Sequence, residues 1–166
     1  MIPSTIGGLP THALIIHFVV VILPAAVIAF AGIGWREPWR RTYALPVALV
    51  AIGAVIAAFI ATESGEALRD QVRDAAGAAG TRADFGDHPE DGELVRNLAI
   101  LFALIACAFW ATMRWQGRFE APKWLSGAIY GVGCLVGAVT VVALVSAGHS
   151  GSALVWRDLG NFVRPK

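Results

Sequence analysis

The sequence predicts an all-α integral membrane protein, a four-helix bundle whose helices pass up, down, up and down through a bilayer. Its 166 residues are 57% hydrophobic and only 15% charged, compared with roughly 45–50% and 25% in water-soluble domains. Four apolar stretches reach or nearly reach the roughly 20 residues that cross a hydrocarbon core. A formal net charge of +1 provides no basic field for a phosphate backbone, which excludes nucleic acid as a partner. We therefore expect a single domain surrounded by the lipid bilayer.

The predicted spans begin with signals typical of helices. Pro10 and Thr11 open the first, Pro46 lies in the first turn of the second, and Asp87 and Glu90 have capping-box spacing ahead of the third. No Lys or Arg precedes the first span, which is longer than the apolar part of a signal sequence, so we expect it to remain in the mature protein. The four predicted spans are residues 13–34, 43–61, 94–113 and 125–148.

The connector between the second and third spans, residues 63–93, is acidic and holds nine of the twelve Asp and Glu residues. Its first half, residues 63–76, keeps apolar positions at helical spacing, which predicts that the second helix continues into water or along the membrane surface. Residues 77–87 are expected to form a loop. Most of these carboxylates are expected to be solvated.

Two short basic connectors, residues 35–41 and 114–124, predict the orientation of the protein. Both carry Arg, and four tryptophans flank or lie within them: Trp35, Trp39, Trp115 and Trp124. Dense basic charge beside an aromatic belt is typical of the cytoplasmic side of a membrane. Both ends of the chain are then expected outside the cytoplasm.

All four histidines fall at the opposite, extracytoplasmic end of the predicted bundle. His12 and His17 lie near the start of the first span, His88 just ahead of the third and His149 just after the fourth. Because His12 and His17 are five residues apart, about 140° around a helix, they cannot both point at one atom. An imidazole in or near the apolar zone is costly unless something satisfies it, so the cluster is a candidate site. The same end carries three further charged candidates: Glu63, Glu66 and Arg96.

Haem b is the first cofactor that this cluster predicts. In a sequentially wound bundle the first and third helices are diagonal, roughly 13 Å apart, and this gap suits a macrocycle ligated from both faces. His17 or His12 would pair with His88 as axial ligands, with His149 in reserve. Arg96 would bind a propionate. The protein would then be an electron-transfer or membrane-anchor subunit.

Two alternatives remain open. In the first, imidazole and carboxylate side chains hold Zn²⁺ or Cu²⁺ directly, because both groups are ligands for these ions. That ligand set would be His12, His88, His149 and Glu63 or Glu66. In the second, no cofactor is bound and the protein is a structural or assembly subunit. Its fourth helix would dock a partner through two small-residue pairs, Gly127 with Gly131 and Gly133 with Gly137.

Four segments carry a resemblance to a known family: LPTHALIIHFVVVILPAA at the start, SGEALRDQV after the second span, the histidine with acids ahead of the third, and GHSGSALVW after the fourth. Over nearly its whole length the chain resembles the bacterial domain of unknown function 2231, a family of small four-span membrane proteins. The resemblance implies a bacterial inner membrane and an architecture similar to four-helix b-type cytochromes. Related domains occur joined to Rieske iron–sulfur domains, which implies a redox or respiratory partner subunit. The family's polar positions would be His12, His17, Glu66, His88 and His149.

Two patterns limit this expectation. The diheme cytochromes place ligand pairs at both membrane faces, whereas every histidine here lies at one face, so a single haem is the most that the sequence supports. The segment GHSGS around His149 is not the GxSxG nucleophile elbow, and no glycine-rich nucleotide motif is present. The sequence therefore identifies no catalytic residue and leaves open whether the protein is an enzyme.

Overall fold

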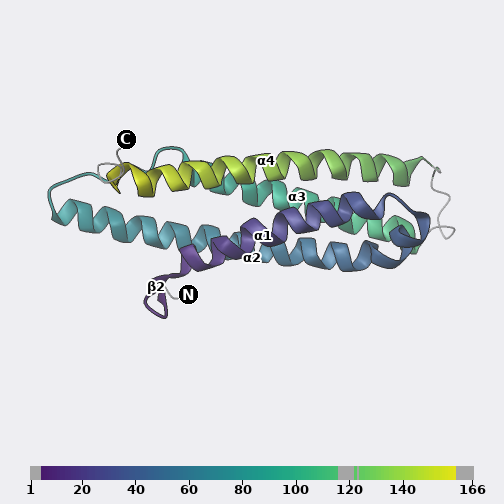
Figure 1. Ribbon diagram of the computed structural model, residues 1–166, viewed down its shortest axis with the longest axis horizontal. Coiled ribbons are helices and arrows are strands. Elements are labelled where there is room, and N and C mark those ends of the chain that lie inside the picture. The colour runs from purple at the N-terminus through teal and green to yellow at the C-terminus, as the bar shows by residue number, and fades with distance from the viewer. Residues whose placement is uncertain (1–4, 116–121, 123, 160–166) are drawn as a thin grey trace, which may run out of the picture.

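The computed structural model describes residues 5–115, 122 and 124–159, and four long helices dominate it (Figure 1). The helices are α1 (Thr11–Ile33), α2 (Glu37–Ala78), α3 (His88–Arg114) and α4 (Leu125–Leu159). A small antiparallel hairpin of β1 (Thr5–Ile6) and β2 (Leu9–Pro10) precedes α1. The predicted all-α four-helix fold is confirmed, with this hairpin as an addition.

Consecutive helices pack against each other, so the bundle is wound in sequence order. α1 packs on α2, α2 on α3 and α3 on α4, whereas α4 and α1 contact each other more sparsely. α1 and α3 are therefore diagonal to each other. The β-hairpin, the start of α3 and the last turns of α4 lie at the same end of the molecule (Figure 1). This is the end at which the sequence places the histidines.

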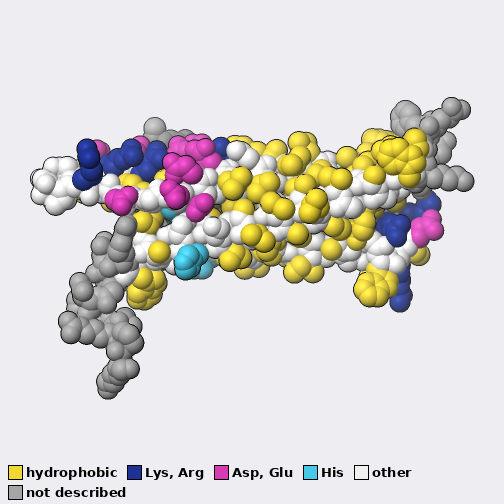
Figure 2. Space-filling model, turned by 90° about the horizontal axis from the view of Figure 1, so that it is seen from above, with side chains coloured by type: hydrophobic (Ala, Val, Ile, Leu, Met, Phe, Trp, Pro, Cys, Tyr) yellow, Lys and Arg dark blue, Asp and Glu magenta, His cyan; other side chains and the backbone are white. Residues whose placement is uncertain are grey.

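All four helices are long and apolar enough to cross a membrane. α2 has 42 residues, about twice the 20 that a bilayer core requires. Its C-terminal part carries charged residues of the acidic connector and extends past the neighbouring helices. Figure 2 shows hydrophobic side chains covering the middle of the molecule and charged ones gathered at its ends. The predicted continuation of the second helix past its span is thus confirmed as far as Ala78.

The helix starts follow the sequence prediction in part. Pro10 is the N-cap residue of α1 and Thr11 its first residue, as predicted. Asp87 is the N-cap residue of α3, but its side chain makes no capping hydrogen bond, so the predicted capping box is wrong. Pro89 instead lies in the first turn, where a missing N–H costs nothing. Glu90 adds a negative charge that complements the helix dipole there.

Aromatic rings fill one half of the core, whereas buried alanines occur in both halves. Towards the basic connectors, Phe30 packs edge-on against Phe102 and Phe109, with ring centroids 5.5 Å apart in both pairs. Towards the histidines, small residues of α2 such as Ala54 and Ala61 are buried. Their small side chains let neighbouring helices approach closely, which is the packing typical of membrane helices.

The glycines of α4 have two different surroundings. A Cβ added to Gly133 would lie 2.5 Å from the ring of Phe30, and one added to Gly137 would lie 2.9 Å from a side chain of α1. Cβ atoms on Gly127 and Gly131 would meet nothing within 4 Å. One predicted small-residue pair therefore packs inside the bundle, and the other opens onto the outer surface.

Candidate functional site

All four helices contribute to one polar cluster at the end of the bundle near the β-hairpin. His12 comes from α1, His88 and Asp91 come from α3, and Ser150 comes from α4. The backbone carbonyl of Ala61 in α2 completes it. Each of these residues lies at or just beyond the end of the apolar part of its helix. The cluster is therefore at the boundary between lipid and water, and it connects all four helices there.

The ring of His12 is fixed against α2. Its Nδ1 lies 2.8 Å from the carbonyl oxygen of Ala61. Because a carbonyl only accepts hydrogen bonds, Nδ1 carries the hydrogen, and the neutral ring keeps a lone pair on Nε2. A Cβ on Gly65 would lie 3.0 Å from the same ring, so the imidazole rests directly on the α2 backbone.

Two consecutive hydrogen bonds through Ser150 hold the ring of His88 against α4. The hydroxyl of Ser150 donates to Asp91 Oδ2 at 2.8 Å, so its oxygen is available to accept from His88 Nδ1 at 3.3 Å. In this arrangement the neutral His88 ring also keeps its lone pair on Nε2. A Cβ on Gly151 would lie 2.7 Å from the ring, so glycine is required there to let the imidazole approach α4.

The two imidazoles meet across the diagonal of the bundle. Their ring centroids are 6.3 Å apart, with an angle of 81° between the ring planes. Burial and the neighbouring His12 lower the pKa of His88 from its usual 6.5, although the Ala147 carbonyl and Asp91 act in the opposite direction. A lowered pKa favours the neutral ring at physiological pH, and a neutral imidazole is the form that binds metals.

The structure does not bring His17 to this cluster. Its side chain is exposed, and its Nδ1 lies 2.5 Å from the carbonyl oxygen of Ala13, one turn earlier in the same helix. The cause is the helical offset of His17 from His12, which turns the two side chains in different directions. Of the two predicted partners of His88, the structure places His12 beside it and His17 elsewhere on α1.

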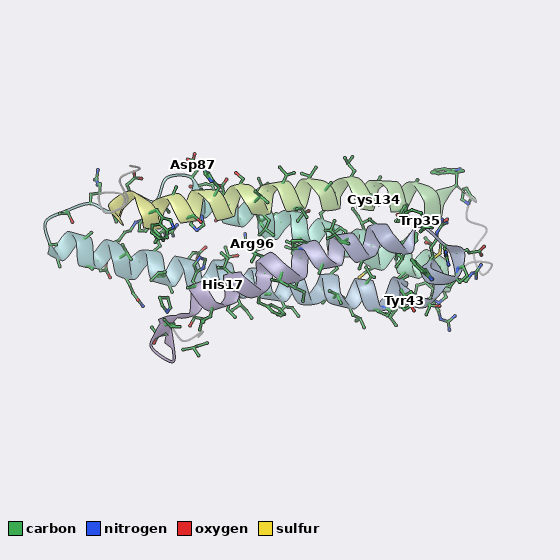
Figure 3. The ribbon with its side chains drawn as sticks, in the orientation of Figure 1. His17, Trp35, Tyr43, Asp87, Arg96 and Cys134 are labelled. Carbon is green, nitrogen blue, oxygen red and sulfur yellow. The ribbon has the colours of Figure 1, made fainter. Side chains whose placement is uncertain are left out.

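The remaining predicted site residues differ in exposure and in their contacts. His149 and Glu63 are exposed and Glu66 is half-buried, while the Arg96 guanidinium lies over the ring of Phe59, 5.4 Å from its centroid. Figure 3 labels His17 on α1 and Arg96 on α3 in the same half of the molecule. Among the described residues, no three His, Cys, Asp or Glu side chains converge as a metal site. The predicted larger ligand set is therefore not assembled.

Ser150 and Asp91 are members of the cluster that the sequence prediction missed. Asp91 lies three residues after His88, a spacing that places both on one face of a helix. Ser150 follows His149 directly, and the turn of about 100° per residue points it inwards while His149 points outwards. The signal for Asp91 was present in the sequence, whereas the role of Ser150 depends on how α4 is rotated.

Four apolar helices and a polar cluster at one boundary define the chain as a multi-pass integral membrane protein. The chain belongs to the family described as "Predicted membrane protein (DUF2231)", whose model matches residues 8–162. No curated protein and no solved structure has significant similarity to the chain.

Proposed function

We propose that this membrane protein binds one transition-metal ion, copper or zinc, between His12 and His88. The observation that carries the proposal is the pair itself: two imidazoles on diagonal helices, each with its Nδ1 held by a hydrogen bond. Metal-binding histidines in proteins almost always have their second ring nitrogen fixed in this way, because the bond sets the tautomer and the ring direction. The Ala61 carbonyl and the Ser150 hydroxyl would be those outer partners.

The spacing of the rings supports a single bound ion. With metal–nitrogen bonds of about 2.0 Å and a ring radius of about 1 Å, two imidazoles on one ion have centroids roughly 5 Å apart in a tetrahedral site and 6 Å apart in a linear one. The observed 6.3 Å is close to the linear value. Solvent at the membrane boundary could supply further ligands. A bound copper ion would supply one-electron chemistry, and a bound zinc ion would act as a Lewis acid.

Haem b fits this pair less well than a single ion does. A macrocycle between the rings would have to extend towards α2 and α4, which flank the diagonal. Both helices are already in contact with the imidazoles, through Ala61 and Gly65 on one side and through Gly151 on the other. Haem binding would therefore require α2 and α4 to move away from the imidazoles. Arg96, the predicted propionate partner, lies against Phe59 instead.

We also propose a bacterial inner membrane and an orientation with the histidine pair on the extracytoplasmic side. The basic end supports this orientation, because Arg36, Arg40 and Arg41 are clustered within one short segment there. A metal-binding subunit facing that side would suit a role in electron transfer or metal handling beside a respiratory partner, in keeping with the expected redox setting.

Metal analysis and an absorption spectrum test the proposal. The protein would be expressed with copper, zinc or haem supplied, purified in detergent, and compared with variants H12A and H88A. We expect about one equivalent of metal per chain in the parent protein and a loss of at least about tenfold in each variant. His149→Ala is the matched control, because this exposed histidine is outside the pair.

Three outcomes would contradict the proposal. These are a parent protein that retains no metal after metal supply, variants H12A and H88A that retain as much as H149A, and a Soret band in place of a bound ion. The third outcome would favour haem b as the cofactor. Unchanged folding and partner binding without all four histidines, in a protein that holds no metal, would favour a structural subunit.

A further inference from the structure

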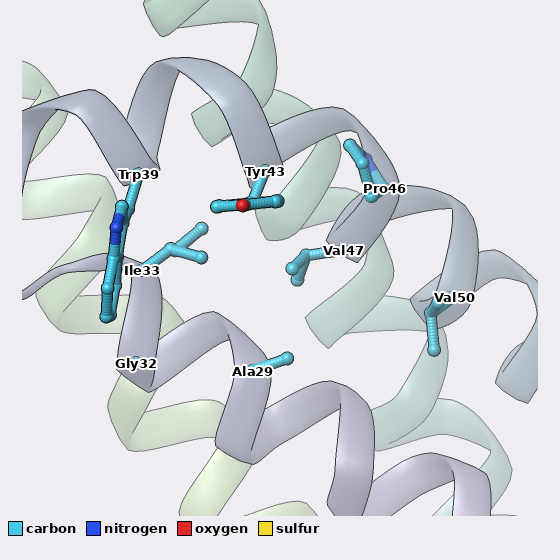
Figure 4. Close-up of a pocket in the computed structure, with 8 residues that line it drawn as sticks. All are labelled: Ala29, Gly32, Ile33, Trp39, Tyr43, Pro46, Val47 and Val50. Carbon is cyan, nitrogen blue, oxygen red and sulfur yellow. The ribbon is translucent and has the colours of Figure 1, made fainter.

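An apolar groove lies at the opposite end of the bundle from the histidine pair. It has a volume of about 500 Å³ and runs between α1 and α2 on the outside of the molecule. Figure 4 shows Ala29 and Gly32 on α1 facing Trp39, Tyr43 and Val47 on α2 across it. Its lining is almost entirely hydrocarbon and aromatic, and it opens sideways to the surroundings of the helices. In a bilayer, the occupant of such a groove has to come from the hydrocarbon.

The groove exists because α1 has no side chain at Gly32. A Cβ there would meet nothing within 4 Å, so the space above this residue is open. On the other wall, Trp39 and Tyr43 are about half exposed, at 42% and 49%. Aromatic rings of these types prefer the level of the lipid headgroups. The groove therefore begins at the membrane interface and runs inwards.

A cation lies against one of the aromatic rings that line this groove. The Arg36 guanidinium lies 5.4 Å from the centroid of the Trp39 ring, and its side chain is exposed. Its two basic neighbours have other described partners. Arg40 donates two hydrogen bonds to the Gly34 carbonyl and closes the turn between α1 and α2. Arg41 is paired with Glu37 at 2.9 Å.

We infer that this groove holds one acyl chain of an anionic phospholipid and that Arg36 binds its phosphate. Arg suits phosphate because its planar guanidinium can donate two parallel hydrogen bonds. A neutral isoprenoid would fill the apolar space but has no phosphate for Arg36. A zwitterionic phospholipid has the phosphate, but its own headgroup cation offsets the negative charge, so an exposed Arg attracts it less than it attracts a lipid with net negative charge. The inference uses no residue of the histidine pair and is independent of the proposed metal site.

Photo-crosslinking of lipids tests the inference on the full chain. The protein would be placed in phosphatidylcholine nanodiscs containing a small fraction of phosphatidylglycerol or phosphatidylcholine with a photoactivatable group on one acyl chain. Labelled peptides would then be mapped by mass spectrometry. We expect phosphatidylglycerol to label residues 29–50 about fivefold more than phosphatidylcholine, the gain typical of one basic residue at an anionic surface.

Two variants and two matched controls separate the headgroup from the chain. Arg36→Gln should remove the preference for phosphatidylglycerol, while Arg114→Gln, which removes an exposed cation elsewhere at the same end, should keep it. Gly32→Leu should fill the groove and lower labelling by both lipids. Gly131→Leu should not, although this glycine is equally open. If G32L does not fold, R36Q still decides the question.

Equal labelling by the two lipids in the parent protein would overturn the inference and leave only ordinary lipid contact. A preference that R114Q weakens as much as R36Q would also overturn it, because the effect would then be one of overall surface charge. Strong displacement of the label by a neutral isoprenoid quinone, with no effect of added phosphatidylglycerol, would assign the groove to a different occupant.

Discussion

The position of His88 depends on the glycine at residue 151. Glycine there lets the imidazole rest on the backbone of α4, since an added Cβ would lie 2.7 Å from the ring. A Cβ at this position would be attached directly to the backbone of a long helix, so the His88 ring rather than α4 would have to move. A displaced ring would lose the Ser150 hydroxyl as the partner of its Nδ1. The geometry of the histidine pair is thus encoded partly in a residue that has no side chain.

The first prediction follows from this contact. Gly151→Ala should lower metal retention about 10- to 100-fold, the loss typical of disturbing an outer partner of a metal-binding histidine. Gly148→Ala is the matched control, because a Cβ at that glycine of the same helix meets nothing within 4 Å. Metal analysis after dialysis against a weak chelator makes the comparison. Equal metal retention by G151A and G148A would show that the contact between the His88 ring and Gly151 is unimportant for metal binding.

The second prediction concerns pH. The pKa of His88 is lowered in the folded protein, mainly by burial and then by His12. The folded state therefore binds fewer protons than the unfolded state below about pH 6.5, and stability should fall as the pH drops through this range. Thermal unfolding of the metal-free protein in detergent, at about pH 7.5 and 5.5, measures the change.

His88→Gln should reduce this pH dependence, because glutamine keeps polarity at the position but does not titrate. His17→Gln serves as the control, since His17 is exposed and lies outside the pair. A pH dependence that H88Q leaves intact and H17Q removes would contradict the assignment.

At the residue scale, the sequence predicted the pairing of His12 with His88 as one of two options. Counting residues placed both at the same end and on diagonal helices. The choice between His12 and His17 depends on the rotation of α1 about its axis, which the packing of α1 on α2 decides. Ser150 was missed for the same reason, because tertiary contacts also determine the rotation of α4 about its axis.

At the scale of the elements, α4 is positioned by its inward glycines. Gly133 and Gly137 accept large side chains of α1 and α3, and the ring of Phe30 fills the space at Gly133. The sequence predicted that these glycines allow close approach, but it did not distinguish an external partner from the bundle itself. The structure assigns this pair to internal packing, which weakens the case for a docking role of that stripe.

The third prediction tests the internal packing. Gly133→Ala should destabilise the bundle by about 1–3 kcal/mol, because the new methyl group would overlap the Phe30 ring. Gly131→Ala should leave stability unchanged or raise it slightly, since its surroundings are open and alanine favours a helix. Thermal unfolding of both variants in the same detergent is the measurement. A G133A protein as stable as G131A would contradict this packing.

The connector after the second span shows where sequence periodicity succeeds and capping rules fail. Apolar positions at helical spacing predicted that the helix continues, and α2 runs to Ala78. The capping-box spacing at the start of α3 gave the correct boundary at Asp87 but not the hydrogen bond. A spacing rule locates a boundary, whereas the bond itself depends on the rotamer of one side chain.

At the scale of the whole molecule, four antiparallel spans place the histidine pair on the same side as both ends of the described chain. The fold class could be predicted from composition and span length, because the bilayer fixes both. The side of the membrane is a separate matter, since it depends on the distribution of basic residues.

The fourth prediction concerns this orientation. Alkaline phosphatase fused after Lys166 should be active, because that enzyme matures only outside the cytoplasm, whereas the same fusion after Trp115 should be inactive. A green fluorescent protein fused at these two positions should give the reverse pattern. An active phosphatase at Trp115 together with an inactive one at Lys166 would invert the topology and place the histidine pair in the cytoplasm.

X-ray absorption at the metal edge of the purified, metal-loaded protein tests the central claim most directly. We predict two imidazole nitrogen ligands at about 2.0 Å, with one of them lost in H88A and both retained in H149A. A first shell that contains sulfur, a porphyrin-type spectrum, or a spectrum that the replacement of His12 and His88 leaves unchanged would contradict a metal ion held by this pair.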